Sequence, residues 1–228
     1  MGFDASVISG VVGFIETDFA LTKIELGWSV SSLSLTATLG MMLSGPVSDR
    51  IGRRPVLKIA AVLFALSAVA SAFAPTFSLF VAARMLGGLG VGAALIIAPM
   101  YIAEIAPAEV RGRLVSFNQL NIVIGISAAF FSNYLVLTLG QSGMAWTEAL
   151  GLGTWSWRWM LGIETLPAIV YFLALSFVPE SPRWLAMHRR EGTALEVLER
   201  LNGPEQAAAD LAEIHASLAG EAEPQGIA

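Results

Sequence analysis

The sequence contains no cysteine, which excludes disulfide bonds, thiolate metal sites and cysteine nucleophiles. It has only two histidines, His188 and His215, both in the polar C-terminal region. A metal site needs several convergent ligands, so neither a metal nor any other cofactor is expected. Charged residues make up only 14% of the 228 residues, compared with about 25% in soluble domains. This shortage of charge argues against an ordinary soluble domain.

The few basic residues lie in short clusters, which excludes the broad basic surface of a nucleic-acid-binding protein. No nucleophile lies near a partner base, so we do not expect an enzyme. Apolar residues are in excess instead: 55% of the chain is hydrophobic, and the mean hydropathy is +0.69. This composition indicates an integral membrane protein.

Five apolar runs are long enough to cross a bilayer as helices, which takes about 20 residues. A sixth run, at the start of the chain, is shorter and is interpreted as the second half of a helix. We therefore predict an all-α membrane protein with a transmembrane bundle over residues 1–180. The predicted spans are 2–14, 26–47, 55–73, 77–102, 114–139 and 159–178.

Arginine and lysine gather in alternate connections between these spans. The connections after the second and fourth spans and the segment after the sixth are rich in arginine, whereas the others are almost devoid of basic residues. The positive-inside rule makes the arginine-rich connections cytoplasmic. We expect a multi-pass protein of the cell (inner or plasma) membrane with both termini in the cytoplasm. Arg158, at the outer start of the sixth span, is the one exception.

The composition changes after residue 180. The stretches TALEVLERL and ADLAEIHASL have leucine and isoleucine at helical spacing, and Gly203-Pro204 separates them. These features predict two short amphipathic helices on the cytoplasmic face within residues 181–219, with a loosely ordered tail as the alternative. For residues 220–228 we favour the disordered tail.

Two charges lie within the apolar runs, Asp4 in the first and Arg84 in the fourth. A charged side chain at mid-membrane costs at least about 2.5–3.5 kcal/mol on insertion scales, so it usually faces a partner or a cavity. Asp4 and Arg84 have opposite signs and can pair. The alternative is that Arg84 extends to the outer interface and that Asp4 is merely terminal, and the sequence leaves both open.

Glycines recur where helices are expected to approach closely. The run RMLGGLGVG superficially suggests a phosphate-binding loop, but such a loop needs a preceding strand, which is absent. Small residues that let membrane helices pack closely are the better account of Gly88 and Gly92. By the same logic, Gly45 is expected to admit a neighbouring helix, and Gly52 to allow a tight connection between two helices.

The three inner membrane junctions each carry charges of both signs. They lie in the stretches GPVSDRIGRRP, PMYIAEIAPAEVRGR and PESPRWL. Charges that pair across helix ends suit a gate that opens and closes. They also suit a static clamp, and the pattern alone does not decide between the two.

Taken together, these stretches resemble the sugar porter family of the major facilitator superfamily. The matching motifs are GFDASVISG, GPVSDRIGRRP, RMLGGLGVG, PMYIAEIAPAEVRGRLVSFNQ, WRWM and PESPRWL, in family order over roughly residues 2–202. The resemblance implies the N-terminal six-helix half of a transporter that binds a monosaccharide between two halves and works by alternating access.

The resemblance also implies roles for individual residues. Asp4 matches the acid with which family symporters take up a proton, and Arg84 matches the arginine that pairs with it. Gln119 matches a glutamine that hydrogen-bonds the sugar, although Ile126 stands where some symporters have a second glutamine. A charge network holding the outward-facing state would include Asp49, Arg50, Arg54, Glu104, Arg111, Glu180 and Arg183.

The two ends of the chain leave alternatives open. Met1-Gly2 with Ser6 fits a loose myristoylation pattern, but the first-helix motif explains more residues, so we expect a cut or mis-called start with the first helix truncated. The C-terminal six-helix half is expected as a missing partner. The leading hypothesis is part of a proton-coupled sugar symporter. The alternatives are a sugar facilitator, a half that transports as a homodimer, and a half without transport activity, such as a pseudogene product or an assembly partner.

Overall fold

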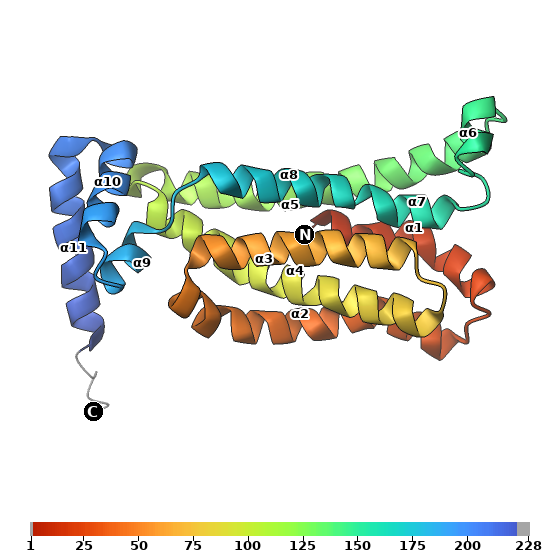
Figure 1. The fold of residues 1–228 in the computed structure, drawn as a ribbon, viewed down its shortest axis with the longest axis horizontal. Helices are drawn as coiled ribbons and strands as arrows, with labels where there is room; N and C mark the ends of the chain where they lie inside the picture. Colours follow the sequence, from red (N-terminus) through yellow and green to blue (C-terminus); the bar gives the residue numbers. More distant parts are fainter. Residues whose placement is uncertain (1, 223–228) are drawn as a thin grey trace.

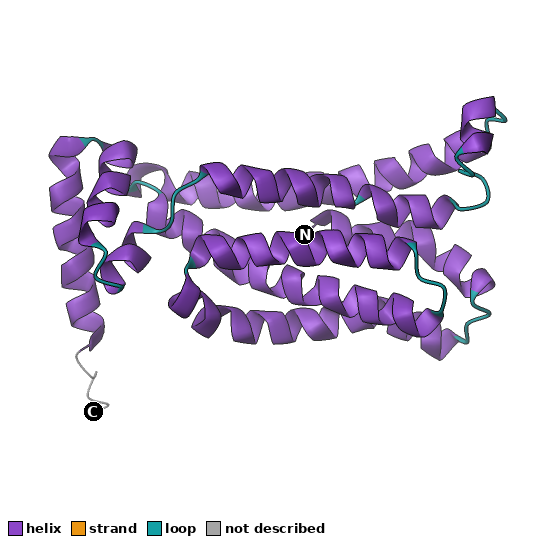
Figure 2. Cartoon of the chain, in the orientation of Figure 1, coloured by secondary structure: helices purple, strands orange, loops and turns teal. Residues whose placement is uncertain are grey.

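A computed structural model of the chain describes residues 2–222, and within that range it contains helices and loops but no strand (Figure 2). The long helices lie side by side in an elongated bundle, and three shorter helices gather at one end (Figure 1). The expected all-α fold is confirmed. The helices are α1 (Gly2–Asp18), α2 (Lys23–Ile51), α3 (Arg53–Ala72), α4 (Phe77–Ile105), α5 (Ala108–Gly140), α6 (Ala145–Ala149), α7 (Ser156–Ile163), α8 (Thr165–Phe177), α9 (Pro182–Met187), α10 (Glu191–Asn202) and α11 (Pro204–Ala222).

Five segments of the described chain are long and apolar enough to cross a membrane: α2, α3, α4, most of α5, and α7 together with α8. Helix α1 has 17 residues and begins near the middle of the bundle (Figure 1). Large apolar side chains are exposed along the membrane-length helices, and Met42 and Phe177 are 71% and 88% exposed. Because each helix satisfies its backbone hydrogen bonds internally, such apolar faces suit contact with lipid.

The segment predicted as one span over 159–178 is divided into α7 and α8, which meet at Glu164. Pro167 explains the interruption, because it has no N–H to donate to the carbonyl of Ile163 four residues earlier. Glu164 lies at the junction and is only 4% exposed. The break therefore coincides with a buried acid.

The connections between helices carry clear local signals. Thr22 accepts a hydrogen bond from the backbone N–H of Glu25, whose carboxylate accepts one from the N–H of Thr22, so a capping box starts α2. The side chain of Thr76 caps α4 in the same way. Helix α2 ends at Gly52, whose φ of +101° strains any residue with a Cβ. Gly52 thus allows the expected tight turn into α3.

At the end of the bundle near α6, Arg158 is a structural residue. Its guanidinium donates hydrogen bonds to the carbonyls of Ala72 and Ala74 at 2.8 and 3.0 Å, which closes the C-terminal end of α3. It also lies over the ring of Trp157, whose indole N–H donates to Asp18 at 2.6 Å. These contacts explain why an arginine stands at this end of the bundle, where the connections contain no other arginine.

Small residues allow α2 and α4 to pack closely. A Cβ on Gly88 would collide with the carbonyl oxygen of Leu33, and one on Gly92 would collide with that of Ala37. Gly40, on α2, meets the backbone of Leu89 in the same way. Backbones this close place the two helices in fixed register.

The expectation for Gly45 is wrong, because nothing lies within 4 Å of the position that its Cβ would occupy. The close approach of α2 to α4 occurs at Gly40 instead, more than one turn earlier. Gly45 precedes Pro46, which lies inside α2. A Cβ before proline disfavours the helical conformation, so glycine suits this position for a local reason.

Within the described residues, three helices follow the bundle where two were predicted. The unexpected one, α9, starts with Pro182 after Ser181, whose hydroxyl accepts from the N–H of Trp184. Helices α10 and α11 correspond to the two predicted amphipathic stretches and meet at Gly203. Because α11 extends to Ala222, residues 220–222 are helical where a tail was expected. Residues 223–228 of the predicted tail lie outside the described range.

Candidate functional site

An ion pair lies inside the bundle between α1 and α4. Arg84 Nη1 is 2.7 Å from Asp4 Oδ1, and Arg84 Nη2 donates to the backbone carbonyl of Asp4 at 3.1 Å. Both residues are only 2% exposed. The sequence left open whether Asp4 and Arg84 pair, and in the structure they do. Asp4 and Arg84 are thus the charges that neutralise one another within the apolar bundle.

Glu164 is a third ionisable group at this site, and the sequence analysis did not select it. Its Oε2 atom lies 4.0 Å from Arg84 Nη1, so two carboxylates approach one guanidinium. The signal that could have found it is the one that singled out Asp4, an acid within a long apolar run.

A cavity of about 550 Å³ opens beside the ion pair. Asp4 and Glu164 form part of its wall, together with Tyr101 of α4 and two amides of α5, Asn118 and Asn121. Amides and hydroxyls both donate and accept hydrogen bonds, so this wall can bind a polar, uncharged ligand. The cavity therefore joins a buried ion pair to groups suited to a hydroxylated molecule.

Gln119 does not line this cavity. It is exposed on α5, on a different face of the helix from Asn118 and Asn121. The structure therefore does not bring Gln119 together with Asp4 and Arg84.

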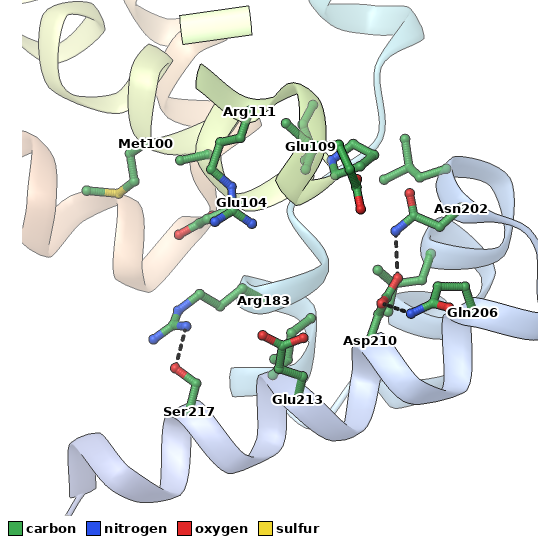
Figure 3. A pocket seen from close by; sticks show the side chains of 17 residues that line it. Met100, Glu104, Glu109, Arg111, Arg183, Asn202, Gln206, Asp210, Glu213 and Ser217 are labelled. Carbon is green, nitrogen blue, oxygen red and sulfur yellow. Dashed lines mark hydrogen bonds between the residues drawn. The ribbon is translucent and has the colours of Figure 1, made fainter. Parts of the chain in front are cut away.

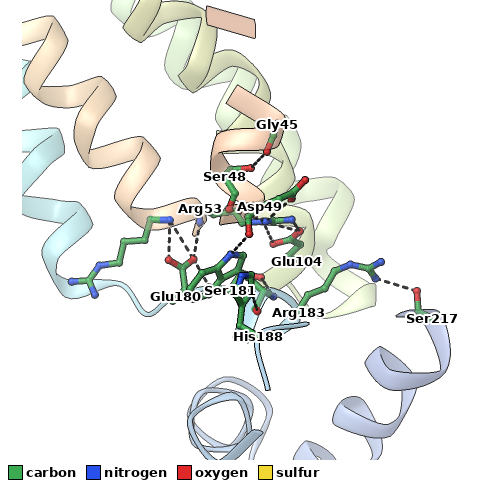
Figure 4. Close-up of polar contacts among 12 residues, drawn as sticks. Gly45, Ser48, Asp49, Arg53, Glu104, Glu180, Ser181, Arg183, His188 and Ser217 are labelled. Atoms are coloured by element: carbon green, nitrogen blue, oxygen red, sulfur yellow. Dashed lines mark hydrogen bonds and ion pairs between the residues drawn. The ribbon is translucent and has the colours of Figure 1, made fainter. Parts of the chain in front are cut away.

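At the end of the bundle near α9, the central residue of the charge network is Arg53. It belongs to the charged motif GPVSDRIGRRP, but the family resemblance did not assign it to the network. Arg53 is 5% exposed and donates to Glu104 through Nε at 3.0 Å and Nη2 at 2.9 Å (Figure 4). Its Nη1 donates to Asp49 at 3.0 Å and to the carbonyl of Ser48 at 3.2 Å. Arg53 thus joins the ends of α2, α3 and α4.

Glu180 occupies the N-terminal end of α3. Its carboxylate accepts hydrogen bonds from the backbone N–H groups of Arg53, Arg54 and Ser181 at 2.8–3.3 Å (Figure 4). An anion is favoured there, because the first N–H groups of a helix have no partner within it. A Cβ on Gly52 would collide with this carboxylate. Gly52 therefore makes room for Glu180 in addition to forming the turn.

Two other expected members of the network, Arg54 and Arg183, donate hydrogen bonds to different parts of the chain. Arg54 donates to the carbonyls of Leu175 and Ser176 at 2.8 and 2.7 Å, so it ties α3 to the end of α8. Arg183 donates to the hydroxyl of Ser217 on α11 at 3.1 Å (Figure 3).

Arg50 and Arg111 are exposed and form no ion pair with any residue in the described range. Because part of the network's partners is expected in a second half, their place in the network stays a prediction. Arg50 has an exposed position near the end of α2, whereas Arg53 at the start of α3 is buried against Glu104. Arg111 lines a cavity of about 1090 Å³ between the bundle and α10 and α11 (Figure 3).

The described residues include no group of three or more acids and histidines placed to hold a metal ion. The helix junctions near α9 are instead held by direct contacts between helix ends. Trp184 of α9, for example, donates its indole N–H to the carbonyl of Asp49 at 2.9 Å. The arrangement provides a buried acid–base pair, a mostly apolar cavity with a few polar groups in its wall, and a network of charges at the end of the bundle near α9.

Comparison with known proteins gives consistent matches along the chain. A family model described as "Sugar (and other) transporter" matches residues 2–227. The arabinose-proton symporter of Bacillus subtilis (strain 168) is 42% identical over 217 residues, which cover 95% of this chain and 45% of that protein. The galactose-proton symporter of Escherichia coli (strain K12) is 39% identical over 218 residues, 95% of this chain and 44% of that protein.

Solved structures give the same result. The proton:xylose symporter XylE of the major facilitator superfamily, bound to 6-bromo-6-deoxy-D-glucose, is 37% identical with a TM-score of 0.88, covering 99% of this chain and 51% of that one. XylE from E. coli in an inward open conformation is 38% identical with a TM-score of 0.83, covering 99% of this chain and 54% of that one. The chain thus spans about half the length of the proteins that it matches.

Proposed function

The chain belongs to the sugar transporter family of the major facilitator superfamily, and from that membership we propose that it forms half of a proton-coupled monosaccharide transporter that works by alternating access. The proteins that it matches are membrane transporters and not enzymes. In this proposal, residues 1–180 form the transmembrane bundle and residues 181–219 form cytoplasmic helices of the linker to a second six-helix half.

The observation that carries proton coupling is the buried contact between Asp4 and Arg84. A buried charge left without its partner is strongly destabilising. While Asp4 is ionised, Arg84 therefore holds α1 against α4. When Asp4 takes up a proton, the attraction between the two side chains is lost and the helices become free to separate. Proton binding at Asp4 thus favours one conformation over the other, which is what coupling requires.

The polar groups of α5 support a sugar as the substrate. Asn118 and Asn121 line the cavity beside Asp4, while Gln119 is exposed on the same helix. Amide groups donate and accept, which matches the hydroxyl groups of a sugar. We propose that Gln119 binds the sugar from the side of the second half. The matched proteins are named for arabinose, galactose and xylose, so the proposal extends only to the class of monosaccharides.

The inner charge network provides a gate in this mechanism. Arg53, Glu104 and Glu180 join the inner ends of α2, α3 and α4 to the segment that leads into α9. We propose that the second half packs on this charge network when the transporter is closed to the cytoplasm. The basic residues at these junctions are then cytoplasmic, and so are both chain termini.

The proposed coupling is tested by measuring sugar uptake in cells that express the full-length transporter gene. We expect Asp4→Asn to abolish uptake driven by a proton gradient, while Glu148→Gln, which changes an exposed acid on α6, leaves uptake unchanged. A protonophore should reduce uptake by the unaltered protein. Uptake that is insensitive to both Asp4→Asn and the protonophore would instead indicate a facilitator.

Whether this half transports by itself is tested separately with the 228-residue chain in liposomes. We expect no sugar uptake, because alternating access requires two halves to move against each other. Uptake by the chain alone would show that it functions as a homodimer.

A further inference from the structure

The second buried acid, Glu164, has no role in the proton coupling proposed above, yet it lies beside the guanidinium of Arg84. Arg84 Nη1 is 2.7 Å from Asp4 Oδ1 and 4.0 Å from Glu164 Oε2. The three side chains are at most 5% exposed. They come from α1, α4 and the break between α7 and α8, so the site joins three separate parts of the bundle.

Two carboxylate oxygens at this site lack a hydrogen-bond partner. Asp4 Oδ2 and Glu164 Oε2 are both buried without a donor among the described residues, and both side chains approach the same nitrogen of Arg84. Ionised carboxylates only accept hydrogen bonds, so two of them cannot satisfy each other. A single proton on either group would provide the missing donor for the other.

The balance of charge leads to the same conclusion. Two ionised carboxylates beside one guanidinium would leave a net negative charge in the apolar interior, which is costly. The neighbouring side chains cannot compensate it: Ser67 of α3, which lies near Gly87 beside Asp4, is uncharged, and so are Asn118 and Asn121 of α5. One proton shared by the two acids makes the site neutral.

We propose that Asp4 and Glu164 hold one proton between them, so that Glu164 is a second proton-binding residue of the transporter. This inference rests on the proposed function and extends it to a particular arrangement of the proton site. The proton moves between the two acids as one O–H bond breaks and the other forms, and the remaining negative charge stays beside Arg84. Only a second proton makes both acids neutral and releases Arg84.

The test is infrared spectroscopy of the full-length transporter in liposomes at neutral pH, following the carbonyl stretch of a protonated carboxylic acid and its shift in deuterated water. We expect the band in the unaltered protein. It should be lost in Glu164→Gln and also in Asp4→Asn, because either change leaves a single acid paired with Arg84. Glu148→Gln, on the exposed face of α6, should retain it.

Three outcomes would overturn the proposal: no band in the unaltered protein, a band that survives in Asp4→Asn, or one that survives in Glu164→Gln. If Glu164→Gln does not fold, Glu164→Asp retains a carboxyl group one methylene further from Asp4, and an unchanged band frequency would then count against sharing. The spectrum requires no transport. Uptake that does not depend on a proton gradient would therefore refute the proposed function while leaving the band in place.

Discussion

Among single residues, Arg53 and Glu104 form a buried ion pair at the end of the bundle near α9, with side chains 6% and 10% exposed. We predict that Arg53→Gln destabilises the protein by about 3–5 kcal/mol, because it leaves Glu104 as a buried charge without its partner. The measurement is thermal unfolding of the full-length transporter in detergent.

The matched comparison is Asp49, which contacts the same guanidinium but has a side chain 57% exposed. Asp49→Asn should cost only about 0–1 kcal/mol, because water already screens this charge. The double variant Arg53→Met with Glu104→Met should be more stable than Arg53→Gln, since neither charge is then left alone. Equal losses in Arg53→Gln and Asp49→Asn would mean that burial does not determine the strength of these contacts.

The same residues show what a sequence can and cannot predict about a site. Asp4 and Arg84 are evident as charges within apolar runs, and the structure brings them together. Arg50, Arg53 and Arg54 are equivalent in a linear motif, yet only Arg53 is buried against Glu104. Which arginine points inward depends on how α2 turns into α3 at Gly52, and this cannot be read from composition or spacing.

At the level of helices, the close packing of α2 against α4 makes the glycines of α4 sensitive to substitution. Gly92→Ala should destabilise the full-length transporter by about 1–3 kcal/mol, because the added methyl group collides with the carbonyl oxygen of Ala37 and the helices must move apart. Thermal unfolding in detergent measures this loss.

Gly27→Ala provides the control on α2, because nothing lies within 4 Å of the position that its Cβ would occupy. It should be neutral or slightly stabilising, since alanine is a better helix former than glycine. A loss as large in Gly27→Ala as in Gly92→Ala would show that helix propensity, and not packing, dominates.

Long apolar runs predicted the membrane-length helices well, since 26–47, 77–102 and 114–139 lie within α2, α4 and α5. The division of the last span at Glu164 was missed, because hydropathy averages over residues and is insensitive to the single N–H that Pro167 lacks. Helix α9 was missed because its six residues are too few to show a period. Its start is nevertheless marked by Ser181-Pro182, because proline is common at the first position of a helix.

For the whole molecule, the proposed orientation can be tested by thiol labelling, because the chain contains no cysteine of its own. Glu196→Cys on α10 and Glu148→Cys on α6 place single thiols at exposed positions near opposite ends of the bundle (Figure 1). A membrane-impermeant maleimide should label Glu148→Cys in intact cells. It should label Glu196→Cys only after the membrane is permeabilised. The reverse result would invert the proposed topology.

The carboxylate of Glu180 also has a consequence for the order in which the molecule is assembled. It binds the N–H of Arg53 across 127 positions of the sequence. Because synthesis runs from the N-terminus, the first turn of α3 has no such partner until residue 180 has been made. The contact that holds the first turn of α3 therefore forms late in the synthesis of this half. Each of its membrane helices has by then been synthesised, and α9 is the next to emerge.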